Sequence, residues 1–275
     1  MIRIVVYLLA AILLLLLIGA LSAALDRGGV NAVWRSLETG GAGQPFSPDV
    51  LGSLPEPARR YLLHAIQPST PLASSVNLTM SGSFCPAPNA PWRRMRAREV
   101  LAAGKGLVWK ASIGGFPPMS GYDLYVRGQG RMEWRVLGLL PVLSACGPDI
   151  SRSAAGRLAA ESVWLPSALL PQNGVRWEAI DDHTALALID LDGQVLRLRL
   201  TIAENGALKE AILENRWGNV TEDKRFAECP LVAKVLEEGT FSGYTIPTSI
   251  TVGWWPDSDR YYEFFRARID SACFR

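Results

Sequence analysis

The sequence predicts a mainly β (α+β) protein with one large curved antiparallel sheet, or half-barrel, of about 10–12 strands and two or three helices, behind an N-terminal transmembrane helix. Three observations support this. Residues 4–25 form an uncharged, mostly aliphatic run of 22 residues. From Ser75 onward, apolar and polar residues alternate in short segments, which Gly, Pro, Asn or Asp separate roughly every 8–12 residues. Two other stretches repeat apolar residues with helical spacing.

The uncharged run is long enough to be a membrane anchor, because at about 1.5 Å per helical residue it crosses a hydrocarbon core of roughly 30 Å. A cleaved secretory signal is the alternative, with Ser22, Ala23 and Ala24 as the small residues before the cut. We favour the anchor because the aliphatic run is longer than the apolar core of a signal. Arg3 favours a cytoplasmic start, so we expect a single-pass protein whose body lies outside the cytoplasm.

The rest of the chain divides into a connector and one body. Residues 26–46 end in a Gly-rich stretch, which predicts a flexible juxtamembrane linker. Residues 47–275 suffice for one large β domain, which we prefer to two small ones. The predicted organisation is therefore a transmembrane anchor (1–25), a linker (26–46) and a single antiparallel β-rich domain (47–275).

Within the body, a helix is predicted over 53–66, where early prolines precede apolar residues at helical spacing. An Ala-rich segment, 151–164, predicts a second helix that ends before Pro166. Tight turns such as Asp192-Gly193 join the strands, which indicates an antiparallel meander. The predicted strands are 76–84, 93–102, 107–113, 122–126, 129–137, 176–181, 184–191, 194–202, 208–216, 239–245, 248–255 and 261–269.

The charge balance argues against a nucleic-acid partner, because 28 basic and 26 acidic residues leave a formal net charge of only +2. A local basic cluster alternates with Met95, Ala97 and Glu99, as the polar face of a strand would. We interpret it as a solvated face, with a phosphate or lipid-headgroup site as the alternative. The basic residues of this cluster are Arg93, Arg94, Arg96 and Arg98.

No catalytic or metal-binding motif is present, so we expect no cofactor and favour a non-enzymatic protein. Only His64 and His183 offer imidazole chemistry, and no Gly-x-Ser-x-Gly elbow places a nucleophile. No Cys-x-x-Cys pair suggests zinc or a redox dithiol. The four cysteines could form two bridges or remain isolated thiols, and their spacing leaves both open. They are Cys85, Cys146, Cys229 and Cys273.

The candidate ligand-binding residues combine three charged side chains with four aromatic ones. Arg157 and Glu161 lie four apart on one helical face, either as an exposed ion pair, which we favour, or as a partly buried pair that lines a pocket. Asp123 lies in an apolar strand, facing outward or pairing with a buried arginine. Large rings fill a β core or line an apolar cavity, and Phe116 is a candidate rim residue. The full set is Trp109, Phe116, Asp123, Arg157, Glu161, Trp164 and Trp177.

Four features together resemble a bacterial family of uncharacterised membrane-anchored proteins: the apolar run and the motifs over 55–62, 121–130 and 157–166. These motifs read PEPARRYL, GYDLY with the following GQG, and RLAAESVWLP. The resemblance covers about Leu54 to Arg268 and implies a place in the bacterial inner (cell) membrane, but no activity. In architecture alone, the meander with an inserted helix is similar to the periplasmic lipoprotein-carrier fold, a curved sheet that holds acyl chains.

We therefore expect a membrane-tethered envelope protein that binds a lipid or another hydrophobic ligand in its curved β body. The alternative is a non-catalytic, membrane-tethered scaffold whose packed body contacts a protein partner through its outer surface.

Overall fold

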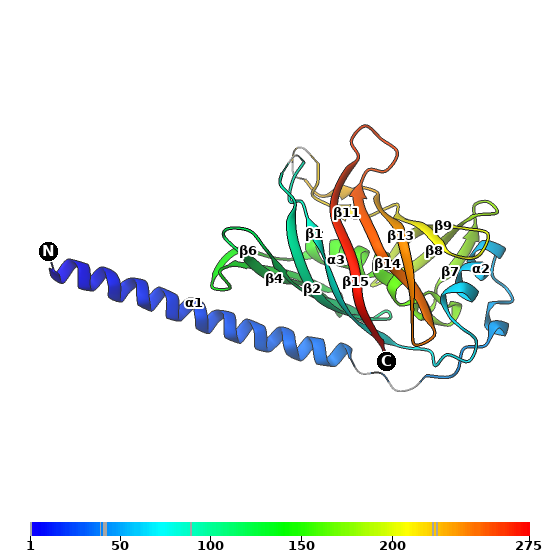
Figure 1. Cartoon of the computed structure of the whole chain (residues 1–275), viewed down its shortest axis with the longest axis horizontal. Coiled ribbons are helices and arrows are strands. Elements are labelled where there is room, and N and C mark those ends of the chain that lie inside the picture. The colour runs from blue at the N-terminus through cyan, green and yellow to red at the C-terminus, as the bar shows by residue number, and fades with distance from the viewer. Residues whose placement is uncertain (1, 39, 41–42, 89, 222, 224) are drawn as a thin grey trace.

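The computed structural model describes residues 2–38, 40, 43–88, 90–221, 223 and 225–275. Within the first helix, the side chains of residues 2, 5, 8, 9, 11, 12, 15, 16 and 18 lie outside the description. One 13-stranded antiparallel sheet dominates the body, in the order β6-β5-β4-β3-β2-β1-β15-β14-β13-β10-β9-β8-β7 (Figure 1). It confirms the predicted mainly β class and the curved antiparallel sheet.

The strands are β1 (Ser75–Phe84), β2 (Arg93–Ala102), β3 (Gly106–Ile113), β4 (Met119–Val126), β5 (Gln129–Val136), β6 (Leu140–Cys146), β7 (Arg176–Ala179), β8 (Thr184–Leu191), β9 (Gln194–Ile202), β10 (Leu208–Leu213), β13 (Leu231–Phe241), β14 (Tyr244–Trp254) and β15 (Tyr262–Phe274). A separate short pair is β11 (Trp217–Gly218) with β12 (Ala227–Glu228). The helices are α1 (Ile2–Leu37), α2 (Glu56–Ala65) and α3 (Pro148–Glu161), with 3₁₀ turns at Pro48–Leu51, Ser162–Trp164, Pro166–Leu169 and Pro171–Asn173.

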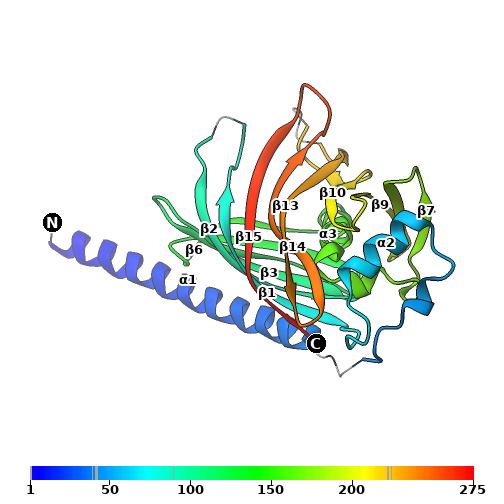
Figure 2. The ribbon, with the colours of Figure 1, turned by 45° about the vertical axis from the view of Figure 1, so that its right-hand side comes forward.

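The connection between the two edge strands explains how the sheet is filled. β6 and β7 lie at opposite edges, and the chain between them forms α3 and three 3₁₀ turns. This segment crosses the concave face, where α3 lies against the sheet (Figure 2). Its buried side chains, among them Leu158, Trp164 and Leu169, join the main hydrophobic core with residues of α2 and the inner strand faces. The concave face is therefore largely packed by the protein itself.

Helix α1 continues beyond the predicted linker boundary at residue 26. It runs through residues 26–37, which were predicted to be flexible, and the predicted linker residues 39, 41 and 42 lie outside the described residues. The reason is an apolar stripe at helical spacing: Val30 and Leu37 are buried, with Trp34 half-buried between them. They pack on the convex face of the sheet in a second, smaller core with Val100 and Val108.

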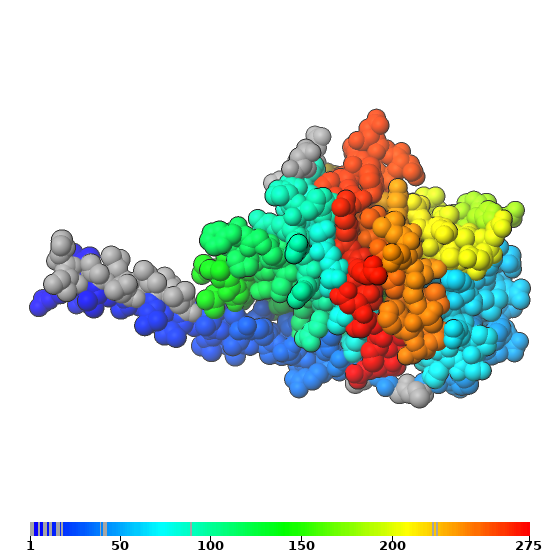
Figure 3. All heavy atoms as spheres, viewed as in Figure 1, coloured from blue at the N-terminus to red at the C-terminus, as the bar shows by residue number. Residues whose placement is uncertain are grey.

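The N-terminal part of α1 projects away from the body (Figure 3). Among the described residues, no helix is long and apolar enough to qualify as a membrane span. The predicted anchor over 1–25 also falls partly on side chains outside the description.

Two strand predictions were wrong. β6 was missed because Pro141 interrupts its pattern, and an edge strand tolerates proline. The predicted strand 239–245 is a hairpin turn, since Ser242 and Gly243 have positive φ and join β13 to β14. Two register shifts in β13 blurred its period. The sheet consequently has more strands than predicted. All four cysteines are free.

Candidate functional site

A cluster of buried charges lies on the concave face between α3 and the first half of the sheet. Arg157 of α3 forms ion pairs with Glu161 one turn later (2.8 Å), with Asp123 of β4 (2.8 Å) and with Glu99 of β2 (3.6 Å). Arg216 lies close enough to interact electrostatically with Arg157, Glu161 and Asp123. We call these five residues the inner charge cluster.

Two features of the backbone bring these groups together: the inward-facing positions of β2 and β4, and the close approach of α3 to β5. Glu99 follows Met95 and Ala97 on the inward-facing side of β2, and Asp123 faces inward from β4. Gly130 of β5 allows α3 to approach, because a Cβ there would lie 2.6 Å from the carbonyl oxygen of Ile150. The Gly130 N–H donates to the Ser151 hydroxyl, which fixes α3 on β5.

Burial controls the ionisation of the cluster. Desolvation, followed by the nearby charge of Glu161, raises the pKa of Glu99 well above its usual range, although Arg157 opposes the shift. Desolvation also raises the pKa of Asp123. Burial and the positive charge of Arg157 lower the pKa of Arg216 to about 10. The cluster therefore holds three carboxyl groups against two arginines, and Glu99 is the group that the fold favours in its neutral form.

Several polar atoms of the cluster have no hydrogen-bond partner within the described part of the chain. They are Oε2 of Glu161, Nε of Arg216 and Nε1 of Trp109, which lies beside the cluster, whereas the Glu99 carboxyl group hydrogen-bonds to the side chain of Glu161. A buried polar atom without a partner costs roughly 1–3 kcal/mol, so such atoms are rare unless water or a ligand satisfies them. Their concentration at one place makes the cluster the most polar part of an otherwise apolar face.

A row of aromatic side chains leads from this point to the rim of the concave face. Trp109 contacts Trp134 (ring centroids 5.7 Å apart) and Phe265 (6.3 Å). Phe265 adjoins Phe264, which stacks on Trp254 at 5.6 Å. The row ends at half-buried rings. We call it the aromatic row: Phe84, Trp109, Trp134, Trp254, Tyr262, Phe264 and Phe265.

A β-bulge lets two consecutive rings contribute to the row. Val252 of β14 pairs with Phe265, whereas the next residue, Gly253, pairs with Glu263, so Phe264 is an extra residue in β15. Consecutive residues of a regular strand face opposite sides, but a bulge locally removes this alternation. Phe264 and Phe265 therefore both contact rings of the row, and both remain half-buried.

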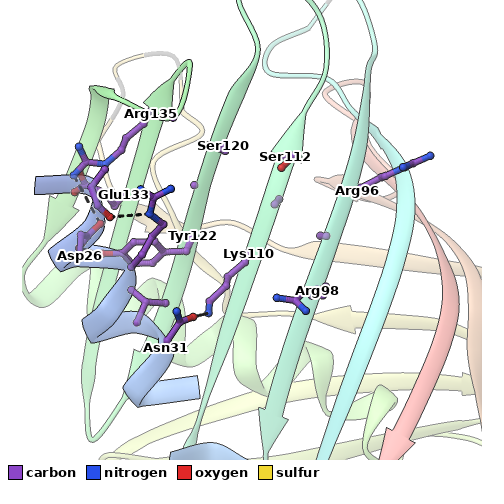
Figure 4. A pocket seen from close by; sticks show the side chains of 17 residues that line it. Asp26, Asn31, Arg96, Arg98, Lys110, Ser112, Ser120, Tyr122, Glu133 and Arg135 are labelled. Atoms are coloured by element: carbon purple, nitrogen blue, oxygen red, sulfur yellow. Dashed lines mark hydrogen bonds and ion pairs between the residues drawn. The ribbon is translucent and has the colours of Figure 1, made fainter. Parts of the chain in front are cut away.

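A pocket of about 480 Å³ lies on the opposite, convex face, between α1 and strands β2–β5 (Figure 4). We call it the outer pocket. At one end, Asp26 of α1 accepts hydrogen bonds from Tyr122 (2.7 Å) and Arg131 (2.9 Å). Beside it, Glu133 pairs with Arg135 at 3.0 Å. The two bonds to Asp26 fasten α1 to the sheet.

The structure unites four of the seven residues proposed from sequence and separates the other three. Trp109, Asp123, Arg157 and Glu161 meet in the inner charge cluster and the ring beside it, since the Arg157 guanidinium lies 4.6 Å from the centre of the Trp109 ring. The Arg157–Glu161 pair is partly buried, not exposed as we favoured. In contrast, Phe116 is 93% exposed in the β3–β4 turn.

The two remaining tryptophans have structural contacts elsewhere. Trp164 is buried and donates to the carbonyl of Pro247, and half-buried Trp177 donates to that of Leu169. The sequence reasoning missed Glu99, Arg216 and the rings of β15. Glu99 had a visible signal, since it follows Met95 and Ala97 at alternate positions of the same strand. Among the described residues, no three His, Cys, Asp or Glu side chains are placed so that they could hold a metal ion.

Residues 52–274 match the profile of a family described as a family of unknown function, DUF6920, which confirms the predicted resemblance to an uncharacterised family. No curated protein matches the chain. Among solved structures, a LolA superfamily protein from Nitrosomonas europaea is similar with a TM-score of 0.43 and 12% identity, over 80% of this chain and 92% of that one. A DUF1329 family protein from Desulfovibrio piger has a TM-score of 0.35 and 10% identity, over 74% and 86%. The expected distant similarity to the lipoprotein-carrier fold is therefore found, with these low TM-scores and identities. A similarity this weak says nothing about what the chain binds.

Proposed function

The chain belongs to the family of unknown function DUF6920, and we propose that it is a membrane-tethered envelope protein that binds a lipid or another hydrophobic ligand on its concave face. The observation that carries this proposal is the aromatic row, which starts at half-buried rings and ends at unpartnered polar atoms. Rings suit an acyl chain or a flat apolar ligand, and a few convergent polar groups fix its orientation.

The polar end favours an amphiphile over a pure hydrocarbon. Nε1 of Trp109 and Nε of Arg216 are donors without a partner, and Oε2 of Glu161 is an acceptor without one. A hydroxyl, ester or carboxyl group at the end of an apolar body would satisfy these atoms. The packed core between α3 and the sheet implies that the ligand enters from the half-buried rings at the rim.

The proposed tether is supported by the projecting part of α1. Its described apolar side chains are widely exposed, among them Tyr7 (72%), Leu13 (59%) and Leu21 (62%). Exposed apolar area costs about 25 cal/mol per Å², so a helix of this composition gains from a hydrocarbon environment. We propose that the run over 4–25 is anchored in the cell membrane and that the body lies on its extracytoplasmic side.

The experiment that tests ligand binding is native mass spectrometry of the full chain extracted in a mild detergent. We expect a lipid-sized adduct on the wild type and about a 10-fold or greater loss of adduct in Phe264→Ala, because a Phe side chain contributes about 1.5–3 kcal/mol when covered. Trp92→Ala is the control, because this ring lies outside the row and stacks under Arg266. A clean apo mass for the wild type would refute the proposal.

One observation favours the alternative of a protein partner. The edge strand β6 leaves Leu140, Val142 and Leu143 between 44% and 54% exposed. An exposed apolar edge strand can pair with an extended segment of another protein. Charged substitution at Val142 would abolish cross-linking to such a partner in cells and leave lipid adducts unchanged.

A further inference from the structure

We propose that the outer pocket contains a binding site for a phosphate group, formed by Arg96, Arg98 and Lys110. This site lies on the convex face, so it is independent of the hydrophobic ligand proposed for the concave face. The pocket is lined by five basic side chains and two acidic ones, and these charges are unevenly distributed along it. Figure 4 shows the acidic groups at the end nearest Arg135, whereas Arg96 and Arg98 lie at the other.

Strand register arranges the lining side chains in two cross-strand rows. In the first row, Arg96 lies opposite Ser112, which lies opposite Ser120. In the second, Arg98 lies opposite Lys110, which lies opposite Tyr122. Directly paired residues have Cβ atoms roughly 4.5–5.5 Å apart, so Arg98 and Lys110 are neighbours, as are Arg96 and Ser112. In Figure 4 the Arg96 side chain extends away from the other two cations, so it has to turn back across β2 to reach a phosphate that Arg98 and Lys110 hold.

The cations at this end have only neutral neighbours within hydrogen-bond or ring-contact distance in the described part of the chain. Lys110 donates to the side-chain oxygen of Asn31 at 2.5 Å and lies 4.7 Å from the centre of the Trp34 ring. Arg98 lies 5.8 Å from the same ring. The described contacts give Arg96 no carboxylate partner, whereas Arg131 and Arg135 are both paired with acids.

The mutual repulsion is visible in the ionisation of the lysine. Burial, followed by the positive charge of Arg98, lowers the pKa of Lys110, and the negative charge of Glu38 only partly opposes this. A bound anion would reverse the repulsion. Two guanidinium groups, an ammonium and a hydroxyl match a tetrahedral oxyanion, because guanidinium donors fit phosphate oxygens in a bidentate manner. The recognised chemistry is a phosphate group, from a lipid headgroup or from a soluble phosphate.

The test uses the full chain in a neutral detergent at low ionic strength. Inorganic phosphate is titrated by calorimetry, and a second series uses neutral micelles doped with phosphatidylglycerol or, for comparison, phosphatidylcholine. We expect the double variant Arg96→Gln/Arg98→Gln to weaken binding about 10-fold or more, since it removes two charge-assisted contacts. The matched control is Arg94→Gln, a residue on the same face of β2 that does not line the pocket.

The two probes distinguish the sources of the phosphate. If inorganic phosphate binds, and the double variant but not Arg94→Gln weakens that binding, the source is a soluble phosphate. If micelles with phosphatidylglycerol bind better than those with phosphatidylcholine, and the variants have the same effects, the source is a lipid headgroup. The proposal is overturned if neither probe binds, or if R94Q weakens binding as much as the double variant does, because nonspecific charge would then explain the binding. Loss of the lipid adduct on the concave face leaves these outcomes unaffected.

Discussion

The inner charge cluster and the outer pocket contain the same kinds of side chain and differ in burial and in charge balance. In the inner charge cluster, Arg157 is surrounded by three carboxylates, and Glu99 is fully buried. In the outer pocket, basic groups are in excess, and Arg96 and Arg98 are exposed. The comparison teaches that burial makes a charged residue necessary for folding, whereas exposure without a partner leaves it available to a ligand. The predictions below test that distinction.

The largest expected effect is the loss of Arg157. Arg157→Leu would leave Glu99, Asp123 and Glu161 without their shared counter-charge, and breaking a buried pair in this way costs about 3–5 kcal/mol of unfolding free energy. Urea unfolding of the full chain measures this.

Arg152→Leu is the matched control on the same helix. Arg152 pairs with Glu228 at the surface, where the two side chains are 37% and 53% exposed. An exposed pair contributes about 0–1 kcal/mol, so we expect little change. Equal losses for the two variants would contradict the distinction between buried and exposed charges.

The second prediction concerns the pH dependence of stability. The pKa of Glu99 is raised in the folded state, mainly by burial, so folding favours its protonated form. The contribution of Glu99 to the free energy of unfolding is fully present below about pH 4.5, where the residue is protonated in the unfolded state as well. This contribution is lost as the pH rises toward the pKa of Glu99 in the folded state. Glu99→Gln should therefore gain stability relative to the wild type as the pH rises through this window, measured by thermal unfolding.

Asp181 should show the opposite sign. The His183 backbone N–H donates to its carboxylate and lowers the pKa of Asp181. Its contribution is therefore present at neutral pH and lost in acid, so Asp181→Asn should lose stability relative to the wild type at neutral pH and converge with it in acid. If the stabilities of E99Q and D181N, each relative to the wild type, changed with pH in the same direction, burial would not control the pKa of Glu99.

The third prediction is a local effect at the other end of the outer pocket. Asp26 links α1 to the sheet through Tyr122 and Arg131, so Asp26→Asn should weaken these contacts by about 1 kcal/mol and free the end of α1 from β5. Hydrogen exchange of residues 23–37 should accelerate while the sheet remains protected. Arg27→Gln is the control, because the hydrogen bond that Arg27 donates in the described part of the chain goes to the Ala23 carbonyl of its own helix. Unchanged exchange in D26N would show that apolar packing alone holds α1.

Local patterns predicted most of the fold and half of the candidate site. Period-2 alternation located the strands wherever it was regular, and helical spacing located α2 and α3. The period-2 alternation failed at Pro141 and in the irregular strand β13, because a strand's position at the sheet edge and its bulges are properties of the assembled sheet. Arg157 and Glu161 were recognisable because they are close in sequence. Glu99 and Arg216 join them only through the crossing of α3 over the sheet, which no local pattern encodes.

The smallest expected effect is the most informative about the outer pocket. Lys110→Met keeps most of the apolar stem and removes the charge. It loses the contact with the Trp34 ring and the bond to Asn31, but it also removes the repulsion from Arg98 and the burial of a cation. Because these terms oppose one another, we expect unfolding free energy to change by no more than about 0.5 kcal/mol, as for Lys105→Met in the exposed β2–β3 turn. Phosphate affinity should nevertheless fall about 10-fold in K110M alone. A loss of stability above about 1.5 kcal/mol would instead make Lys110 a structural residue, because a residue kept for a ligand should be dispensable for folding.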